Sequence, residues 1–113
     1  MQKEYKLKKR ASFNYIYRKG TVFSNDDFVL YTVKTKGALK VGFSVSKKVG
    51  GSVQRNRVKR QMRESVRLMM PEITPGYNII FVARSTVYGK KSSVIADSMR
   101  SLLKKAGLLG HSL

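Results

Sequence analysis

The sequence predicts an α+β fold, a single-domain two-layer sandwich in which a central sheet of about four strands packs against helices. The first observation is length, because 113 residues are enough for one domain and few for two. The second is composition, because 42% hydrophobic residues is ordinary for a globular protein with a core. The third is that helical and strand patterns follow one another in the order α-β-β(-β)-α-β-α. We expect residues 1–113 to form one domain, with a flexible basic arm at 1–10 and a tail at 108–113.

A short first helix is expected close to the N-terminus. Ser12 is a plausible N-cap, and Phe13, Ile16 and Tyr17 follow it at helical spacing. Gly20 stands where a left-handed C-terminal cap would be expected. The helix therefore spans about two turns.

Two strands are expected next, at 28–33 and 40–46. The first is rich in β-branched and aromatic residues and follows a turn signal at 25–27. Lys36 and Gly37 mark a second turn that brings the chain back. We expect these two strands to form an antiparallel pair.

The longest helix is predicted from about 53 to 70, where Pro71 ends it. The segment 78–83 is almost entirely apolar, which is typical of a central strand that is covered on both faces. The strand–helix–strand unit over 41–83 can form a parallel pair across the helix. The sequence pattern alone leaves the handedness of that connection open.

A last helix is predicted after the loop at 85–91. It begins near Ser92 or Ser93, and Gly107 closes it. One of its faces is apolar, consisting of Ile95, Met99, Leu102, Leu103 and Ala106. The loop at 85–91 has no evident role in the sequence.

The charge balance is extreme. Twenty-four Lys and Arg stand against six Asp and Glu, which gives a formal net charge of +18. A compact chain of this charge repels itself, so the surplus indicates a surface for a polyanion. The candidate partners are nucleic acid, an anionic membrane and an acidic protein.

The chain has no cysteine, so it can form neither a disulfide framework nor a thiolate metal site. The first residues lack the apolar run of a signal peptide. No stretch approaches the roughly 20 apolar residues that span a bilayer. These features predict a cytoplasmic location.

The helix predicted over 53–70 sorts its residues into two stripes. The apolar stripe consists of Val58, Met62, Val66 and Met69. The stripe beside it consists of Asn56, Arg60, Arg63 and Arg67. Lys59 lies near the boundary, while Arg55 and Arg57 crowd the first turn. The helix can therefore bury one side and present a row of cations on another.

A purely structural origin for this row is disfavoured. Like charges four residues apart destabilise a helix by a few tenths of a kcal/mol, roughly 0.2–0.5 per pair. Arginine matches phosphate oxygens with two donors at once, and a helix N-terminus favours a phosphate as well. Gly50 and Gly51 precede the helix and would let an RNA backbone approach closely. A solvated basic face is the alternative, but the clean sorting and the net charge favour RNA binding.

Residues 55–60, Arg-Asn-Arg-Val-Lys-Arg, follow the strand end Phe-Ser-Val-Ser-Lys-Lys at 43–48. This combination strongly resembles the signature of the bacterial ribonuclease P protein component. The resemblance extends over nearly the whole chain, including 7–9, 28–31 and 79–84. It implies a protein subunit that binds the catalytic RNA and the 5′ leader of precursor tRNA, which assists removal of the leader. It also implies a left-handed crossover between the parallel strands, against the general rule.

The resemblance further implies a division of roles. The RNA would bind Mg²⁺ and carry the chemistry, and the protein would act as a monomer with no cofactor of its own. The residues expected to bind RNA are Lys47, Lys48, Arg55, Asn56, Arg57, Lys59, Arg60, Arg63 and Arg67. Three positions depart from the family pattern: Gly51, the loop at 85–89 and the short C-terminal tail.

Aromatic residues predict a second surface. Phe28, Leu30 and Tyr31 cannot all face inward on a regular strand, so Tyr31 points away if the other two enter the core. An outward aromatic can stack on single-stranded bases. The resemblance places Phe13, Tyr17 and Tyr31 at the aromatic positions that line the leader cleft. For Phe13 the sequence leaves core and contact equally open.

No catalytic residue is expected in the protein. A nuclease would need clustered carboxylates or a histidine pair. The six acids are scattered, Asp26 and Asp27 suit a turn, and His111 lies near the chain end. A stand-alone nuclease is therefore disfavoured, as is a membrane-active helix, whose apolar side would be bulkier. A ribosomal protein or a general RNA chaperone remains the alternative.

Overall fold

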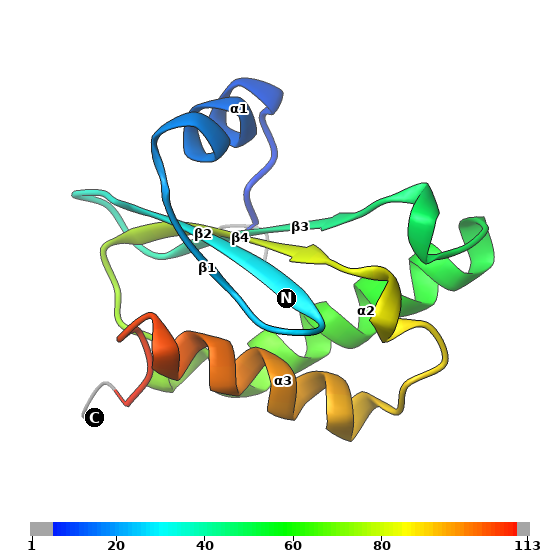
Figure 1. Ribbon diagram of the computed structural model, residues 1–113. Coiled ribbons are helices and arrows are strands. Elements are labelled where there is room, and N and C mark those ends of the chain that lie inside the picture. The colour runs from blue at the N-terminus through cyan, green and yellow to red at the C-terminus, as the bar shows by residue number, and fades with distance from the viewer. Residues whose placement is uncertain (1–5, 111–113) are drawn as a thin grey trace.

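The computed structural model describes residues 6–110 and confirms the α+β fold (Figure 1). Its helices are α1 (Arg10–Lys19), α2 (Ser52–Met69) and α3 (Ser92–Lys105). Its strands are β1 (Thr21–Ser24), β2 (Phe28–Lys34), β3 (Lys40–Val45) and β4 (Tyr77–Ala83). Short 3₁₀ turns follow β3, α2 and β4, namely η2 (Lys47–Val49), η3 (Met70–Glu72) and η4 (Ser85–Val87). The helices α2 and α3 cover one face of the sheet, and α1 adds a partial layer on the other.

The strand order is β1-β2-β4-β3, so the predicted antiparallel pair of 28–33 and 40–46 is wrong. Strand β4 lies between them, antiparallel to β2 and parallel to β3. The most apolar strand takes the central place because both of its faces are covered there. The short connection between β2 and β3 can step over β4, because two strand spacings amount to only about 10 Å.

The parallel pair across α2 is confirmed. In Figure 1, β3 runs behind β4, the chain returns through α2 beneath the sheet, and β4 then runs in the same direction nearer the viewer. This path makes the crossover left-handed, as expected from the resemblance. The connection places α2 under the β3 edge of the sheet, with one side free.

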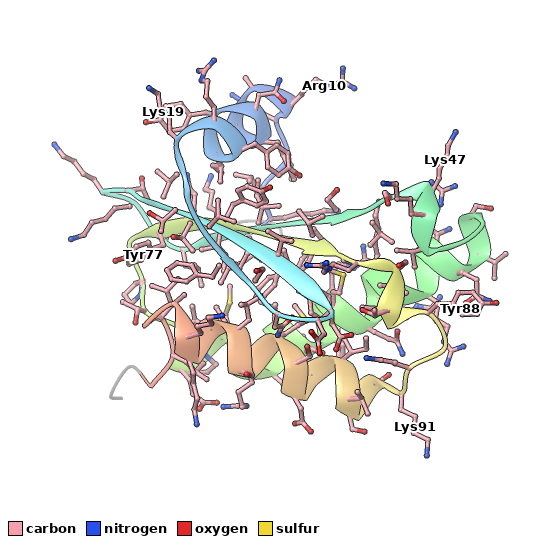
Figure 2. All side chains as sticks on the ribbon, in the orientation of Figure 1. Arg10, Lys19, Lys47, Tyr77, Tyr88 and Lys91 are labelled. Carbon is pink, nitrogen blue, oxygen red and sulfur yellow. The ribbon has the colours of Figure 1, made fainter. Side chains whose placement is uncertain are left out.

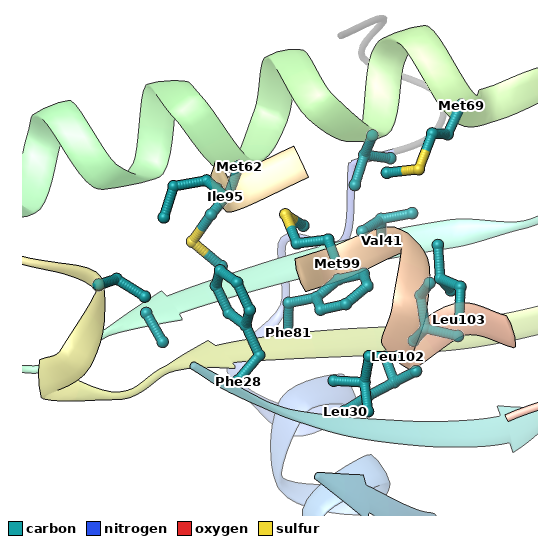
Figure 3. Close-up of a cluster of buried hydrophobic side chains, with 14 of the residues drawn as sticks. Phe28, Leu30, Val41, Met62, Met69, Phe81, Ile95, Met99, Leu102 and Leu103 are labelled. Carbon is teal, nitrogen blue, oxygen red and sulfur yellow. The ribbon is translucent and has the colours of Figure 1, made fainter. Parts of the chain in front are cut away.

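The main core lies between the sheet and the pair α2 and α3 (Figure 3). Met62 of α2 and Met99 of α3 are fully buried against Phe28 and Phe81 of the sheet. The two phenylalanine rings meet edge to face, with centroids 6.1 Å apart. This packing fixes the rotation of α2 about its axis, and hence the direction in which its cations point.

A smaller cluster lies under α1 and consists of Leu7, Ile16 and Ile80. The arm expected at 1–10 is not free where the structure describes it, because Lys6 forms a parallel bridge with Val41. The backbone N–H of Leu7 donates to the carbonyl of Val41 at 3.0 Å. A buried leucine in the basic segment secures it to the sheet.

Two predicted caps of the first helix are wrong. The N-cap of α1 is Lys9, so the helix begins before Ser12. Gly20 is extended, with φ −73°, and does not adopt the left-handed conformation. A Cβ there would lie 2.5 Å from the carbonyl oxygen of Ile16, so glycine is needed for close approach.

The tail expected at 108–113 is attached where it is described. Leu108 is buried, and its carbonyl accepts from the N–H of Thr74 at 2.8 Å. Leu109 forms a bridge with Ile73. The short edge strand β1 is predicted only as an optional extra strand, without a residue range. Most of its side chains are exposed, so its sequence lacks the apolar pattern of a buried strand.

Candidate nucleic-acid interface

One side of α2 faces solvent and carries the predicted row of cations. Asn56, Arg60 and Arg67 are exposed, and Arg63 is half-buried. Residues three and four apart share one side of a helix, so these four side chains form one row. The opposite arc faces the core and consists of Val58, Gln61, Met62, Ser65, Val66 and Met69. The predicted sorting of the helix into two faces is confirmed.

Cations on either flank of the row extend it. Lys59 and Arg63 help line a small pocket at the edge of β3. Arg57 and Arg60 line a hollow of about 330 Å³ with Ser92, at the start of α3. The cationic surface therefore wraps around α2 from the sheet edge to the neighbouring helix.

The N-terminus of α2 is open. Its N-cap is Gly51, no side chain caps the first turn, and no acid occurs there. The first N–H groups of such a helix lack intrahelical partners and carry a partial positive charge. Nε of Arg55 is buried and has no hydrogen-bond partner within the described residues. Lys47 and Lys48 are exposed on η2, immediately before this turn.

The turn before α2 requires glycine at one position. Gly50 has φ +150°, which side chains rarely adopt, and a Cβ there would lie 3.0 Å from Cβ of Gln54. Gly51 has φ −70° and open space around it. The departure from the family pattern at Gly51 therefore falls on a position that tolerates a side chain.

The loop at 85–91 supports the middle of α2. Nε2 of Gln61 donates to the carbonyl oxygen of Lys90 at 3.1 Å, and Nζ of Lys90 lies 2.6 Å from Oδ1 of Asp27. Thr86 donates to the same carboxylate oxygen at 2.8 Å. Burial would raise the pKa of Asp27, but the hydrogen bonds from Lys90 and Thr86 and the charge of Lys90 hold that pKa below its ordinary value. The loop thus ties α2 to the β1–β2 turn.

Sequence reasoning missed this arrangement. The three groups that meet here come from Asp27, Gln61 and Lys90, which are far apart in the chain. Asp27 is predicted only as a turn residue, and the turn itself is confirmed by Oδ1 of Asn25, which accepts from two backbone N–H groups. A polar residue at 61, on the apolar side of a helix, is the one available signal.

A row of three aromatic rings lies between α1 and the sheet. The rings of Phe13 and Tyr17 have centroids 6.2 Å apart, and those of Tyr17 and Tyr31 are 4.9 Å apart and nearly perpendicular. Phe28 and Leu30 are fully buried, so Tyr31 points to the opposite face, as predicted. Tyr17 is 37% exposed, and Tyr31 and Phe13 are half-buried. The structure brings the three predicted residues together.

Phe13 also connects this row with α2. Its ring covers Gly42 of β3, where a Cβ would lie 2.6 Å from Cζ of the ring. A pocket of about 110 Å³ at the β3 edge is lined by Phe13 together with Lys59 and Arg63. The aromatic row and the cationic helix therefore form one continuous surface around that edge. Phe13 therefore does both things that the sequence left open: it packs on Gly42, and it lines a surface pocket.

The described acids lie away from this surface or are paired. Nε of Arg67 donates to Glu64 at 3.0 Å, and Arg100 contacts Glu72 at 3.1 Å. These arginine hydrogen bonds hold the pKa of both glutamates below the ordinary value. Within residues 6–110, no three metal-ligating side chains gather. Glu4 and His111 lie outside the described residues.

Comparison with known proteins identifies the family of this chain. A family model described as Ribonuclease P matches residues 1–107, nearly the whole chain. This chain belongs to the ribonuclease P protein family. The ribonuclease P protein component of Clostridium acetobutylicum is 46% identical to it over 110 residues, which cover 95% of this chain and 92% of that protein. The component from Oceanobacillus iheyensis is 37% identical and covers 99% and 94%.

Solved structures of the family agree with the fold. The ribonuclease P protein of Staphylococcus aureus superimposes with a TM-score of 0.86 at 36% identity, covering 93% of this chain and 97% of that one. The protein of Thermotoga maritima gives a TM-score of 0.82 at 26% identity, covering 88% and 96%. Members of the family are protein components of a ribonucleoprotein endoribonuclease that matures the 5′ end of tRNA together with an RNA subunit. Among residues 6–110, no helix is long and apolar enough to cross a membrane.

Proposed function

We propose that this ribonuclease P protein binds the catalytic RNA through α2 and the 5′ leader of precursor tRNA through the aromatic row under α1. The observation that carries the proposal is the solvent-facing row of α2, held opposite a fully packed core face. The residues assigned to the catalytic RNA are Lys47, Lys48, Arg55, Asn56, Arg57, Lys59, Arg60, Arg63 and Arg67. Phe13, Tyr17 and Tyr31 are assigned to the leader.

The chemistry of each surface supports its assignment. Guanidinium groups donate two parallel hydrogen bonds to phosphate oxygens, and the open N-terminus of α2 offers further N–H donors. Aromatic rings stack on unpaired bases without regard to sequence, which suits a leader whose sequence differs between tRNAs. The surface around the β3 edge lets one protein hold both RNAs next to each other.

The protein acts on affinity and position, and the RNA carries out the hydrolysis. Held by the three aromatic rings, the leader would add binding energy that mature tRNA lacks. Mg²⁺ is assigned to the RNA, because the acids among residues 6–110 are paired or separate and offer no ligand set for it. We further propose that the protein is a monomer and acts in the cytoplasm.

Reconstitution with a ribonuclease P RNA tests the proposal. Precursor tRNA cleavage is measured at low Mg²⁺ with and without the protein. We expect clear stimulation by the wild-type protein and little stimulation by an Arg60→Glu/Arg63→Glu variant. Lys36→Glu/Lys104→Glu, an equal change of four charges at exposed positions outside α2, is the control for net charge. Absence of stimulation by the wild-type protein would contradict the proposal.

The leader site makes a separate prediction. Tyr31→Ala should weaken binding of precursor tRNA to the holoenzyme by about 5- to 100-fold, the loss expected for one stacked base, and leave mature tRNA unchanged. Tyr31→Phe should bind as the wild type does. Tyr15→Ala, at a half-exposed tyrosine of α1 outside the aromatic row, is the matched control. Equal losses for the two tRNAs would remove Tyr31 from the leader site.

A further inference from the structure

Tyr88 is the most exposed aromatic side chain among residues 6–110. Its side chain is 59% exposed and follows η4 in the loop between β4 and α3. The neighbouring Val87 is fully buried, so the loop turns one apolar side chain inward and the next outward. Figure 2 places Tyr88 at the end of the molecule where Lys47 also lies, beside the start of α2.

The ring of Tyr88 rests on the turn that precedes α2. A Cβ at Gly50 would lie 3.5 Å from Cε2 of the ring, which is ordinary contact distance. Val53, one residue into the first turn of α2, is 77% exposed. An apolar surface is therefore present directly beside the open helix N-terminus, where Arg55 has a buried Nε without a partner in the described chain.

The loop that carries Tyr88 is fixed on both sides. Before it, Thr86 donates to the carbonyl oxygen of Asp26 and to the carboxylate of Asp27, both at 2.8 Å. After it, Lys90 contacts Asp27 at 2.6 Å and accepts from Gln61 at 3.1 Å. A ring presented on a fixed loop loses little conformational freedom when it binds.

The segments near this ring are basic. The segments that meet here contribute exposed basic side chains: Lys47, Lys48, Arg57, Arg84 and Lys91. Of the two acids on the supporting turn, Asp27 is neutralised by Lys90 and Asp26 is exposed. An aromatic ring among cations fits a partner that combines a flat base with an adjacent phosphate.

We propose that Tyr88 stacks on an unpaired base of the catalytic RNA, next to phosphates bound at the N-terminus of α2. The inference rests on the proposed function and adds a contact that the sequence signature does not contain. Tyr88 belongs to the surface of α2 and not to the leader cleft. Its loop packs against η2 and is hydrogen-bonded to Gln61 of α2, whereas α1 lies across the sheet. The loop at 85–91, without evident role in the sequence, thereby becomes part of the RNA interface.

Fluorescence tests the stacking directly, because the chain contains no tryptophan. Tyr88→Trp introduces a single indole, and stacking on a base should strongly quench its emission when the catalytic RNA is added. Ser101→Trp, on the exposed side of α3, is the control and should change little. Equal emission changes in the two proteins would overturn the proposal.

Affinity supplies a second readout. Tyr88→Ala should weaken binding of the catalytic RNA by roughly 5- to 100-fold, while Tyr88→Phe retains wild-type affinity. The slope of log K against log salt should stay unchanged in Tyr88→Ala, because no phosphate contact is removed. Wild-type affinity in Tyr88→Ala, with RNA binding otherwise intact, would overturn only this inference. If the affinity of the wild-type protein for the catalytic RNA did not depend on salt, the proposed function itself would be overturned.

Discussion

At the scale of single residues, Phe13 shows how one side chain serves both packing and surface. Its ring covers Gly42 and contacts Tyr17, yet it also lines the pocket shared with Lys59 and Arg63. The tip of the ring can approach β3 this closely only because residue 42 has no side chain. Glycine at 42 thus sets the distance between α1 and β3, and with it the shape of the aromatic row.

Gly42→Ala should therefore destabilise the fold and disturb the leader site. The new Cβ would meet the Phe13 ring at 2.6 Å and Leu7 at 3.2 Å, so the Phe13 ring or α1 must shift. We expect a loss of about 1–3 kcal/mol in the free energy of unfolding, as for other overpacked sites. Denaturant unfolding measures it, with Gly37→Ala as the control because nothing lies within 4 Å of a Cβ there. Equal stability of the two variants would show that α1 accommodates the methyl group freely.

Asp27 predicts a dependence of stability on pH. Its folded-state pKa is lowered, so the unfolded state binds a proton more readily, and the stabilisation is present above the unfolded pKa of about 3.9. It is lost as the pH falls through the lower folded pKa. Asp27→Asn should cost about 2 kcal/mol of unfolding free energy at pH 5–8, since a buried charged hydrogen bond is removed. Denaturation curves measured against pH would refute this if the difference persisted unchanged below pH 3.

Local pattern predicts some of these residues and not others. Alternation along a strand is enough to point Tyr31 away from Phe28 and Leu30, because neighbouring side chains take opposite faces. The contacts of Asp27 with Lys90 and of Tyr88 with Gly50 join distant parts of the chain. The pattern of residues within one segment cannot predict a contact with a segment that is distant in the sequence.

At the scale of elements, α2 is the part that sequence predicts best. Its length, its end near Pro71 and its two faces all follow from spacing within 18 residues. The stripe of buried residues is wider than predicted, because Gln61 and Ser65 join it through hydrogen bonds. Polar residues enter the core side because each has a partner there.

The row on α2 predicts the salt dependence of RNA binding. Arg60→Ala or Arg63→Ala should each reduce the slope of log K against log salt by about 0.7–0.9, the value for one phosphate contact. Filter binding of the catalytic RNA over a range of salt concentrations measures it. An unchanged slope in both variants would mean that these guanidinium groups do not contact phosphates.

Glu64 offers the opposite change on the same helix. It holds Arg67 through an exposed ion pair, so Glu64→Gln should free that guanidinium for RNA and steepen the slope. The stability of the free protein should change little, because solvent screens an ion pair that is exposed on the helix surface. We therefore expect Glu64→Gln to raise the affinity for RNA, whereas Arg60→Ala and Arg63→Ala lower it.

At the scale of the whole molecule, a net charge of +18 is carried on a compact domain. The described acids neutralise only a few positions, so repulsion remains across the surface of α1, η2 and α2. Repulsion of this kind opposes the folded state until counterions or RNA offset it.

The thermal stability of the free protein should therefore rise with salt. Between 0.01 and 0.2 M sodium chloride the screening length falls from about 30 Å to less than 10 Å, shorter than the molecule. We expect the Tm to increase by several degrees, as measured by circular dichroism. A Tm that is constant or falls over this range would show that like-charge repulsion is negligible in the fold.

Topology is where sequence reasoning fails at this scale. Two strands joined by a short turn usually pair, and here β4 enters between them from nearly forty residues later in the chain. The residue pattern of a strand predicts how deeply that strand is buried, but it does not predict which strand will pair with it. The parallel pairing across α2 was accessible only because a strand–helix–strand unit has few other solutions.

The central position of β4 has a consequence for biosynthesis. While the ribosome has released only the first seventy residues, β2 and β3 have no strand between them and α2 has no sheet to pack on. The nascent arginine-rich segment can already attract any nearby transcript by charge, but it cannot yet orient its side chains. Under the proposed function, we therefore expect selective recognition only after Ala83 has left the exit tunnel, so that translation of the last third of the message sets when the protein can bind its RNA.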